Sequence, residues 1–467
     1  MTGGNVHVEP FIHLVEVAHD CALVGIGAFW FRQLDDHGRW EIVDDEQLEK
    51  VAGRKHCVGS QAEPYGHLAV EVLDASGEIV ARADTKSKTW TWVEGLQPET
   101  DYRYRVMVDG DQWAAGECWD WVPSERGGYD LAPAGRRYDL RFRTWPEPTA
   151  VSPRLQFAAL GDYGVGIRSD SESSRRQRRI AEALEKIVDD HDVQLVVSLG
   201  DTIYQGEQGQ VDDESGGEDD DWYSSFFQPY RYVISRVPVY PTVGNHDADD
   251  TEGSDDRAQM EDNFHTQERF QDTSGRASVT PGLFYKLPYG RDIELICLDS
   301  SMADPAEHVH RHFQDPKHVD WLNTVFTPDD VLWRIPFSHH PVYCAGPSHV
   351  NDDEMLESLV PLFDRSDVRL VLAGHEHNFQ VSTVGDRTYV VSGAGGKLRE
   401  GVPEHFKEAH TWLWAEQSHL LLIDIDGESA SLTPVSGLLE NGELHLMTAM
   451  TTSNEIVYPP ITVRSPR

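Results

Sequence analysis

Short apolar runs alternate with an amphipathic stretch in the middle of the chain. LQFAALGD, which begins at residue 155, and VQLVVSLGD, which begins at residue 193, are nearly continuous apolar runs that end in Gly-Asp. Such runs are typical of strands covered on both faces, and the segment 172–190 between them has the spacing of a helix. Further runs of this kind are VPVYPTVGNHD, IELICLDS, WRIPFSHH and VRLVLAGHEH. The alternation predicts a layered α/β domain.

The pattern before residue 146 is different, because apolar and polar residues alternate there with the period of strands. HLAVEVLDASGEIVARADT (67–85) is a predicted hairpin with its turn at Ser76-Gly77. The segment 89–113 resembles the last strands of fibronectin type III-like sandwiches. A proline-rich stretch then follows. We therefore predict an N-terminal all-β sandwich domain over 1–145, a linker over 146–154 and the α/β domain over 155–467.

Composition limits the partners of this chain. The 467 residues contain 80 acidic and 40 basic side chains, which gives a formal net charge of −40. Such a surface repels polyanions, so we expect no nucleic acid partner, and no membrane partner either.

The expected cellular compartment follows from the targeting signals that are not visible in the sequence. No run approaches the ~20 apolar residues of a membrane span, and no secretory signal is visible at the start. The five cysteines have no CxxC spacing, so we expect them to be reduced and mostly buried. The expected location is therefore cytoplasmic.

Side chains that bind metals follow five of the predicted strands. The blocks are Gly161-Asp162, Gly200-Asp201, Gly244-Asn245-His246-Asp247, His339-His340 and Gly374-His375-Glu376-His377. In α/β sheets, ligands bind beyond the carboxyl ends of the strands, where loops from several strands converge. One Gly-Asp or one His-x-His is most often a turn or a surface feature. The complete set is much harder to obtain by chance and predicts a metal site.

In these blocks the chain resembles the calcineurin-like metallophosphoesterases, and within them the purple acid phosphatases. That family's ordered blocks are GD, GDxxY, GNH(D/E), VxxH and GHxH, and the resemblance covers about residues 155–395. It implies a four-layer α/β/β/α sandwich preceded by an extra β domain. It also implies two metal ions, a ferric ion and a divalent ion (Fe, Zn or Mn). The implied ligands are Asp162, Tyr204 and His377 for the ferric ion, Asp201 as the bridge, and Asn245, His339 and His375 for the divalent ion.

Two of these assignments have alternatives. A phenolate is a hard anionic donor that suits a ferric ion, so Tyr204 distinguishes this type of centre. The alternative is that Tyr204 is a packed tyrosine beside a Mn, Zn or mixed centre. The VxxH block reads Pro-Phe-Ser-His and lacks its valine. The H-x-P context selects His339 over His340, and Pro341 holds His340 extended, so the two side chains are expected to point apart.

The resemblance implies a binuclear hydrolase that cleaves phosphomonoesters, small phosphate esters, by attack of metal-bound hydroxide. His246 and His349 match the family's histidines that face the substrate, and Asp247 is expected to orient one of the imidazoles. A phosphodiesterase on the same scaffold, or a metal-containing interaction module without turnover, are the alternatives. His308, His310, His312 and His318 are expected to lie on a solvated surface.

Overall fold

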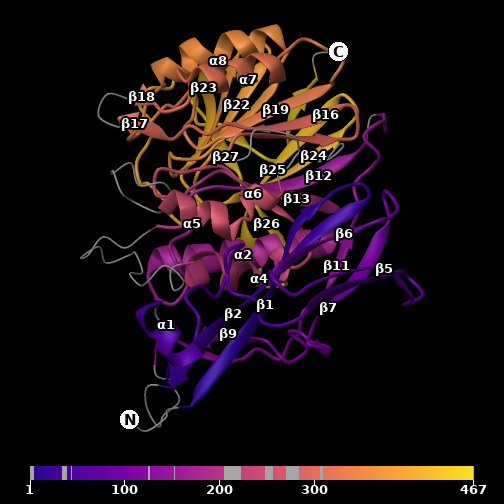
Figure 1. Cartoon of the computed structure of the whole chain (residues 1–467). Helices are drawn as coiled ribbons and strands as arrows, with labels where there is room; N and C mark the ends of the chain where they lie inside the picture. The colour runs from indigo at the N-terminus through magenta and orange to yellow at the C-terminus, as the bar shows by residue number, and fades with distance from the viewer. Residues whose placement is uncertain are drawn as a thin grey trace.

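The computed structural model describes residues 5–33, 39–43, 45–124, 127–151, 153–204, 222–247, 256–269, 283–304 and 309–465. Two mixed sheets pack face to face in the second part of the chain, and helices cover their outer faces (Figure 1). The fold is therefore a four-layer α/β/β/α sandwich, as the sequence predicts.

The first of these sheets has the strand order β14-β13-β12-β24-β25-β26, and β29 pairs with β25. Strands β12, β13 and β14 are parallel, so their carboxyl ends lie at one edge. The bounds are β12 Leu155–Leu160, β13 Val193–Ser198, β14 Val239–Pro241, β24 Leu420–Asp426, β25 Ser429–Leu438, β26 Leu444–Leu446 and β29 Ile461–Arg464.

The second sheet has the order β15-β16-β19-β20-β22-β21-β23-β27-β28, and β16, β19, β20 and β22 run parallel. The bounds are β15 Tyr285–Tyr289, β16 Ile293–Cys297, β19 Trp333–Ser338, β20 Leu370–Ala373, β21 Phe379–Val384, β22 Arg387–Ser392, β23 Thr411–Ala415, β27 Ala449–Thr451 and β28 Ile456–Val457. Apolar side chains of both sheets form one buried cluster between them.

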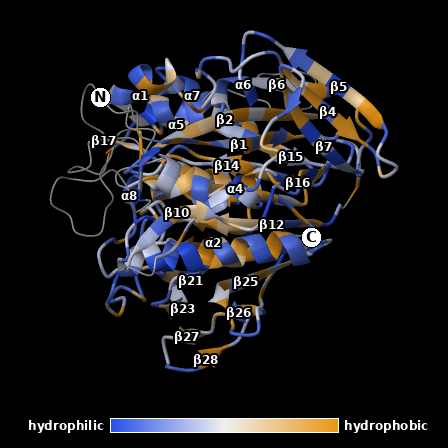
Figure 2. Cartoon of the chain, turned by 90° about the horizontal axis from the view of Figure 1, so that it is seen from below, coloured by the Kyte–Doolittle hydropathy of each residue, from blue (hydrophilic) through white to orange (hydrophobic). Residues whose placement is uncertain are grey.

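Helices α2 (Glu172–Asp190) and α4 (Gln228–Ile234) cover the first sheet, and α7 (Pro316–Val325) and α8 (Asp353–Arg365) cover the second. Helix α2 begins where Ser171 accepts a hydrogen bond from the Ser174 amide. It buries Ile180, Leu184 and Ile187, and its hydrophilic and hydrophobic positions alternate along its length (Figure 2). The shorter elements of this half are η1 (Tyr223–Phe227), α5 (Asp256–Asn263), α6 (Thr266–Arg269), β17 (Met302–Asp304) and β18 (Val309–His310).

The N-terminal part consists mainly of antiparallel sheets, one with the order β1-β2-β3 plus β6 and one with the order β11-β7-β4-β5 plus β8. The predicted hairpin is β4 and β5. This part also contains one α-helix in its described residues, α1 (Asp45–Ala52). The strands are β1 Val6–Val17, β2 Cys21–Gln33, β3 Trp40–Ile42, β4 Leu68–Leu73, β5 Ile79–Thr85, β6 Trp90–Glu94, β7 Asp101–Val108, β8 Asp111–Gln112, β9 Trp119–Pro123, β10 Tyr129–Pro133 and β11 Arg141–Arg143.

Buried ion pairs join the N-terminal sheets to the rest of the chain. Arg231 of α4 lies 2.5 Å from the Glu9 carboxylate of β1, and both side chains are buried. Arg269 of α6 lies 3.1 Å from Glu16 of the same strand. Because each charge is desolvated together with its partner, these contacts fix the position of β1 against the α/β sandwich.

The cysteines agree with the expectation. All five cysteines are buried and free. Among the described residues, no helix is both long enough and apolar enough to cross a membrane.

The prediction of a solvated histidine surface is wrong for His310 and His312. The His310 ring is buried between the Ser300 carbonyl, 2.7 Å from Nδ1, and the Asp352 carboxylate, 2.9 Å from Nε2. Nε2 of His312 lies 3.1 Å from the buried Asp299 carboxylate. Carboxylates from distant parts of the chain supply these partners, which the local pattern does not reveal. His308 lies outside the described residues.

Candidate metal centre

The carboxyl ends of β12, β13, β14, β19 and β20 bring their side chains to a common edge. Asp162, Asp201 and His375 follow three of these strands with φ values of 56°, 52° and 69°. This left-handed conformation is uncommon for residues other than glycine, and it often occurs at functional sites. A Cβ on Gly244 would collide with the Asp201 carboxylate. The loops are therefore packed more closely around Asp201 than any larger residue at position 244 would allow.

One group of donors consists of Asp162, Tyr204 and His377. The His377 Nε2 atom lies 3.3 Å from Oδ1 of Asp162 and 3.3 Å from the Tyr204 hydroxyl. The Tyr204 hydroxyl lies 3.4 Å from the same Asp162 oxygen. A carboxylate, a phenol and an imidazole therefore present their polar atoms to one small volume, with Asp162 fully buried.

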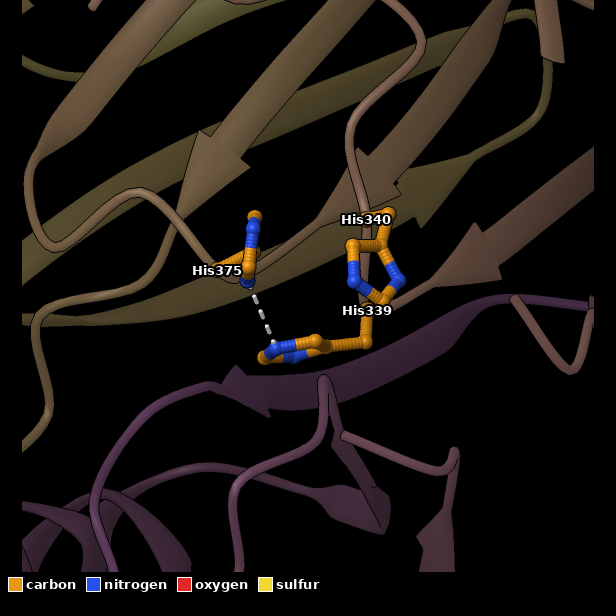
Figure 3. Close-up of side chains that lie close together, drawn as sticks. All are labelled: His339, His340 and His375. Atoms are coloured by element: carbon orange, nitrogen blue, oxygen red, sulfur yellow. Dashed lines mark hydrogen bonds between the residues drawn. The ribbon is translucent and has the colours of Figure 1, made fainter. Parts of the chain in front are cut away.

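A second group consists of Asn245, His339 and His375. The Asn245 Oδ1 atom lies 2.9 Å from His339 Nε2 and 3.0 Å from His375 Nδ1. The His375 Nδ1 and His339 Nε2 atoms are 3.1 Å apart, and a dashed line joins them in Figure 3. One amide oxygen and two imidazole nitrogens thus converge.

Asp201 lies between these two groups. Its Oδ1 atom accepts a hydrogen bond from the His246 amide at 3.0 Å and lies 3.5 Å from His339 Nε2. Its Oδ2 atom is buried and has no hydrogen-bond partner. A buried carboxylate oxygen without a partner is costly in a folded protein, so this atom fits a metal ligand.

The electrostatics of the two groups also fit cations. Burial and the Asp201 carboxylate raise the pKa of Asp162 well above its usual value. Burial and both carboxylates raise the pKa of the Tyr204 phenol. Burial and the Arg399 charge lower the pKa of His377 to about 3, so this imidazole is neutral and able to coordinate. Buried carboxylates need positive charge to offset their desolvation, and neutral imidazoles are able to bind a cation beside them.

His340 lies closer to this centre than expected. Its ring centroid is 5.1 Å from that of His339 and 4.4 Å from that of His375, so the two neighbouring side chains do not point apart (Figure 3). Strand β19 ends at Ser338, and the alternation of a strand therefore no longer applies to the next two residues. The Nδ1 atom of His340 pairs with the Ser300 hydroxyl, whereas Nε2 of His339 faces Asn245 and Asp201.

The three proposed catalytic residues occupy different positions around the centre. The His246 ring lies over Tyr204, with 4.5 Å between ring centroids. The His349 ring stacks on His375 at 3.9 Å. Asp247 differs from the expectation. Its carboxylate accepts hydrogen bonds from the backbone amides of Gly244, Thr202 and Ile203. Among the described hydrogen bonds of this carboxylate, none involves an imidazole. Asp247 holds the loops after β13 and β14 together.

Glu376 is a residue of the site that the sequence reasoning missed. It is fully buried, and Oε2 lies 2.9 Å from His349 Nδ1 and accepts the His349 amide at 2.9 Å. Its other oxygen lies 3.2 Å from Arg399 Nε. The sequence places Glu376 between His375 and His377, which are both proposed ligands. A carboxylate at such a position is expected to be buried, and a buried carboxylate needs a partner.

A family model described as calcineurin-like phosphoesterase matches residues 155–379, which contain every residue of both donor groups. Residues 155–379 are a calcineurin-like phosphoesterase domain. The phosphoesterase domain contains the carboxyl ends of all five strands, and its family implies a binuclear metal centre and a small phosphate ester substrate.

Relatives of the phosphoesterase include named purple acid phosphatases. Purple acid phosphatase 3 of Arabidopsis thaliana is 24% identical over 282 residues, which are 56% of this chain and 69% of that protein. Tartrate-resistant acid phosphatase type 5 of Oryctolagus cuniculus is 24% identical over 269 residues, 54% of this chain and 75% of that protein. The matched domain and these relatives support a metallophosphoesterase of purple acid phosphatase type that acts as a phosphatase.

Two solved structures share the fold of the phosphoesterase and of the part before it. A structure of PhoD has a TM-score of 0.62 at 12% identity and covers 96% of this chain and 91% of its own. The purple acid phosphatase PPD1 from yellow lupin (Lupinus luteus) has a TM-score of 0.57 at 13% identity, with coverages of 99% and 74%.

Proposed function

We propose that this enzyme hydrolyses phosphomonoesters at a binuclear metal centre. The observation that carries the proposal is that the donors of two three-residue groups converge beside Asp201, whose Oδ2 atom is buried without a partner. One carboxylate between two such groups is suited to bridging two cations.

The two donor groups differ in hardness, which suggests different ions. Asp162, Tyr204 and His377 would hold a ferric ion, because a carboxylate and a phenolate are hard anionic ligands. Asn245, His339 and His375 would hold a divalent ion, which is Fe, Zn or Mn. When bound, the two ions supply Lewis-acid polarisation of the phosphoryl group and lower the pKa of water.

The chain's own residues bind the ester and handle its protons. Lys397, whose Nζ atom is 4.8 Å from the Tyr204 ring centroid, adds positive charge for the phosphoryl group. His349 lies beside His375 and is the proposed proton donor to the leaving oxygen. The Glu376 carboxylate lies 2.9 Å from Nδ1 of His349. This leaves Nε2 of His349 for the substrate.

The test of the proposed function compares a monoester with a diester of one phenol. Metal-replete protein is expected to hydrolyse 4-nitrophenyl phosphate with a much higher kcat/KM than bis(4-nitrophenyl) phosphate. The reverse preference would identify a phosphodiesterase, and lack of turnover on both esters would favour an interaction module. Either result would overturn the proposal.

Tyr204→Phe tests the ferric assignment. A phenolate bound to a ferric ion is expected to give a visible charge-transfer band, and removal of the hydroxyl abolishes the band. Absorption spectra of the iron-loaded wild type and variant check this, with iron content measured in both. An iron-loaded wild type without such a band, or a band that survives in Tyr204→Phe, would rule out tyrosinate ligation.

Glu376→Gln tests whether the buried carboxylate acts through His349. The substitution keeps an acceptor for the His349 amide but removes the negative charge beside Nδ1, so kcat on an alkyl phosphate is expected to fall about 10- to 100-fold. Hydrolysis of nitrophenyl phosphate depends less on a proton donor and is expected to fall less.

A double-mutant cycle separates this role from a general loss of structure. If Glu376 acts through His349, adding Glu376→Gln to His349→Ala costs no further activity. Additive losses in the double variant, at equal metal content, would show that Glu376 acts elsewhere.

A further inference from the structure

A cavity of about 620 Å³ extends from the candidate metal centre to the beginning of α8. His340, His349 and His375 line one end of it. Met302, Val309 and Val350 contribute apolar surface along its length. This volume falls within the range of pockets that bind small molecules. The proposed proton donor, His349, lines this cavity. The cavity therefore lies on the side of the site where the alcohol of the ester would leave.

The far end of the cavity is anionic. Asp352, Asp353, Glu354 and Glu357, all from the start of α8 or its N-cap, line it, whereas no Lys or Arg belongs to its described lining. Asp352 caps the helix and pairs with His310. The Glu354 carboxylate accepts hydrogen bonds from the His310 amide and the Gln314 side chain. Asp353 and Glu357 are exposed and carry their charge into the opening.

Positive charge lies on the other side of the centre. Arg399 Nη2 lies 3.5 Å from His377 Nδ1, and Lys397 lies over the Tyr204 ring. The charge around the site therefore changes sign from the side of Arg399 and Lys397 to the cavity beside His349. A substrate with an anionic phosphoryl group at one end and a positive charge at the other matches this change of sign.

We propose that the cavity holds the alcohol part of a phosphomonoester and that this alcohol carries a small cation, an amine or a quaternary ammonium group. The inference rests on the proposed function, since it places the phosphoryl group at the metal centre. In the reaction, the oxygen of water forms the new P–O bond, and the ester P–O bond breaks with its electron pair on the alcohol oxygen. That oxygen takes a proton from His349, and the proton released by the attacking water balances it.

Choline phosphate and 3,3-dimethylbutyl phosphate provide the test, because they have nearly the same shape and differ in one positive charge. Metal-replete wild type is expected to show at least about a tenfold higher kcat/KM for choline phosphate, the sum of several partly exposed ion pairs. Added salt is expected to reduce this ratio, because it screens exposed charges.

Asp353→Asn combined with Glu357→Gln removes the two exposed charges and is expected to bring the ratio to within about threefold. Asp320→Asn combined with Glu440→Gln changes the net charge equally at exposed positions outside the cavity and is expected to keep the wild-type ratio.

Calorimetric titration with choline gives a readout that does not need turnover. Choline is expected to bind wild type about tenfold more tightly than it binds the cavity variant.

Equal kcat/KM values for the two esters in wild type, or a ratio that the cavity variant leaves unchanged, would overturn the inference while leaving the proposed function intact. Choline binding that is equal in wild type and cavity variant would also overturn it. Failure of the metal-replete protein to hydrolyse either ester or 4-nitrophenyl phosphate would instead overturn the proposed function, and the inference with it.

Discussion

Asp201→Asn is expected to lose metal at both positions and at least about 10³-fold in kcat/KM on phosphomonoesters. Asp201 is the proposed bridge between the two donor groups, and its Oδ2 atom is buried without a hydrogen-bond partner. The amide of asparagine has nearly the same shape but no charge, so it cannot offset two cations in a buried site. Metal content and the rate on 4-nitrophenyl phosphate, measured on the same samples, check the expectation.

His339→Ala is the matched control for this substitution. It removes a donor from the group that contains Asn245 and His375 but none from the group that contains Asp162, Tyr204 and His377. This variant is expected to keep the ion at the tyrosine side and lose the other. If Asp201→Asn retained the metal content of wild type, or if His339→Ala emptied both positions, Asp201 would not be the shared ligand.

The stability of the metal-free protein gives a second measurement of the same role. Burial and the Asp201 carboxylate raise the pKa of Asp162, whereas the His339 and His246 side chains and the His246 amide lower the pKa of Asp201 against the effect of its burial. Because the fold favours the charged form of Asp201, the metal-free Asp201→Asn variant is expected to unfold at a lower temperature than metal-free wild type at neutral pH. Adding metal is expected to raise the unfolding temperature of wild type and not that of the variant.

Several features of the fold could be predicted from local pattern because they depend on residues that are close in sequence. The helix at 172–190 matches α2, since its apolar residues and its Ser171 cap are local signals. Strands β12 and β13, which end at Leu160 and Ser198, follow from continuous apolar runs. Helix α1 was missed because the all-β prediction came from the strands around it.

Contacts between distant residues could not be predicted in the same way. The pairing of His310 with Asp352 joins residues 42 positions apart, and that of His349 with Glu376 joins residues 27 apart. The role of Asp247 depends on two loops that meet only in the folded chain. A sequence pattern identifies which side chains can ionise or coordinate, but burial and partner choice are properties of the packed structure.

His349→Ala is expected to keep the metal content of wild type and to lose about 10² to 10⁴ in kcat on alkyl phosphates. The residue belongs to the loop after β19, where Glu376 holds its Nδ1 side and His375 stacks against its ring. An alkoxide is a poor leaving group that needs a proton, whereas a nitrophenolate leaves without one. The loss on 4-nitrophenyl phosphate is therefore expected to be much smaller than the loss on an alkyl ester.

Two further variants make this comparison decisive. His445→Ala removes an exposed histidine of β26 and is expected to leave both rates unchanged. His246→Ala removes the other histidine beside the centre, the one whose ring lies over Tyr204. If His349 only bound the phosphoryl group, both esters would lose rate equally. Equal losses in His349→Ala, together with a selective loss on alkyl esters in His246→Ala, would transfer the role of proton donor to His246.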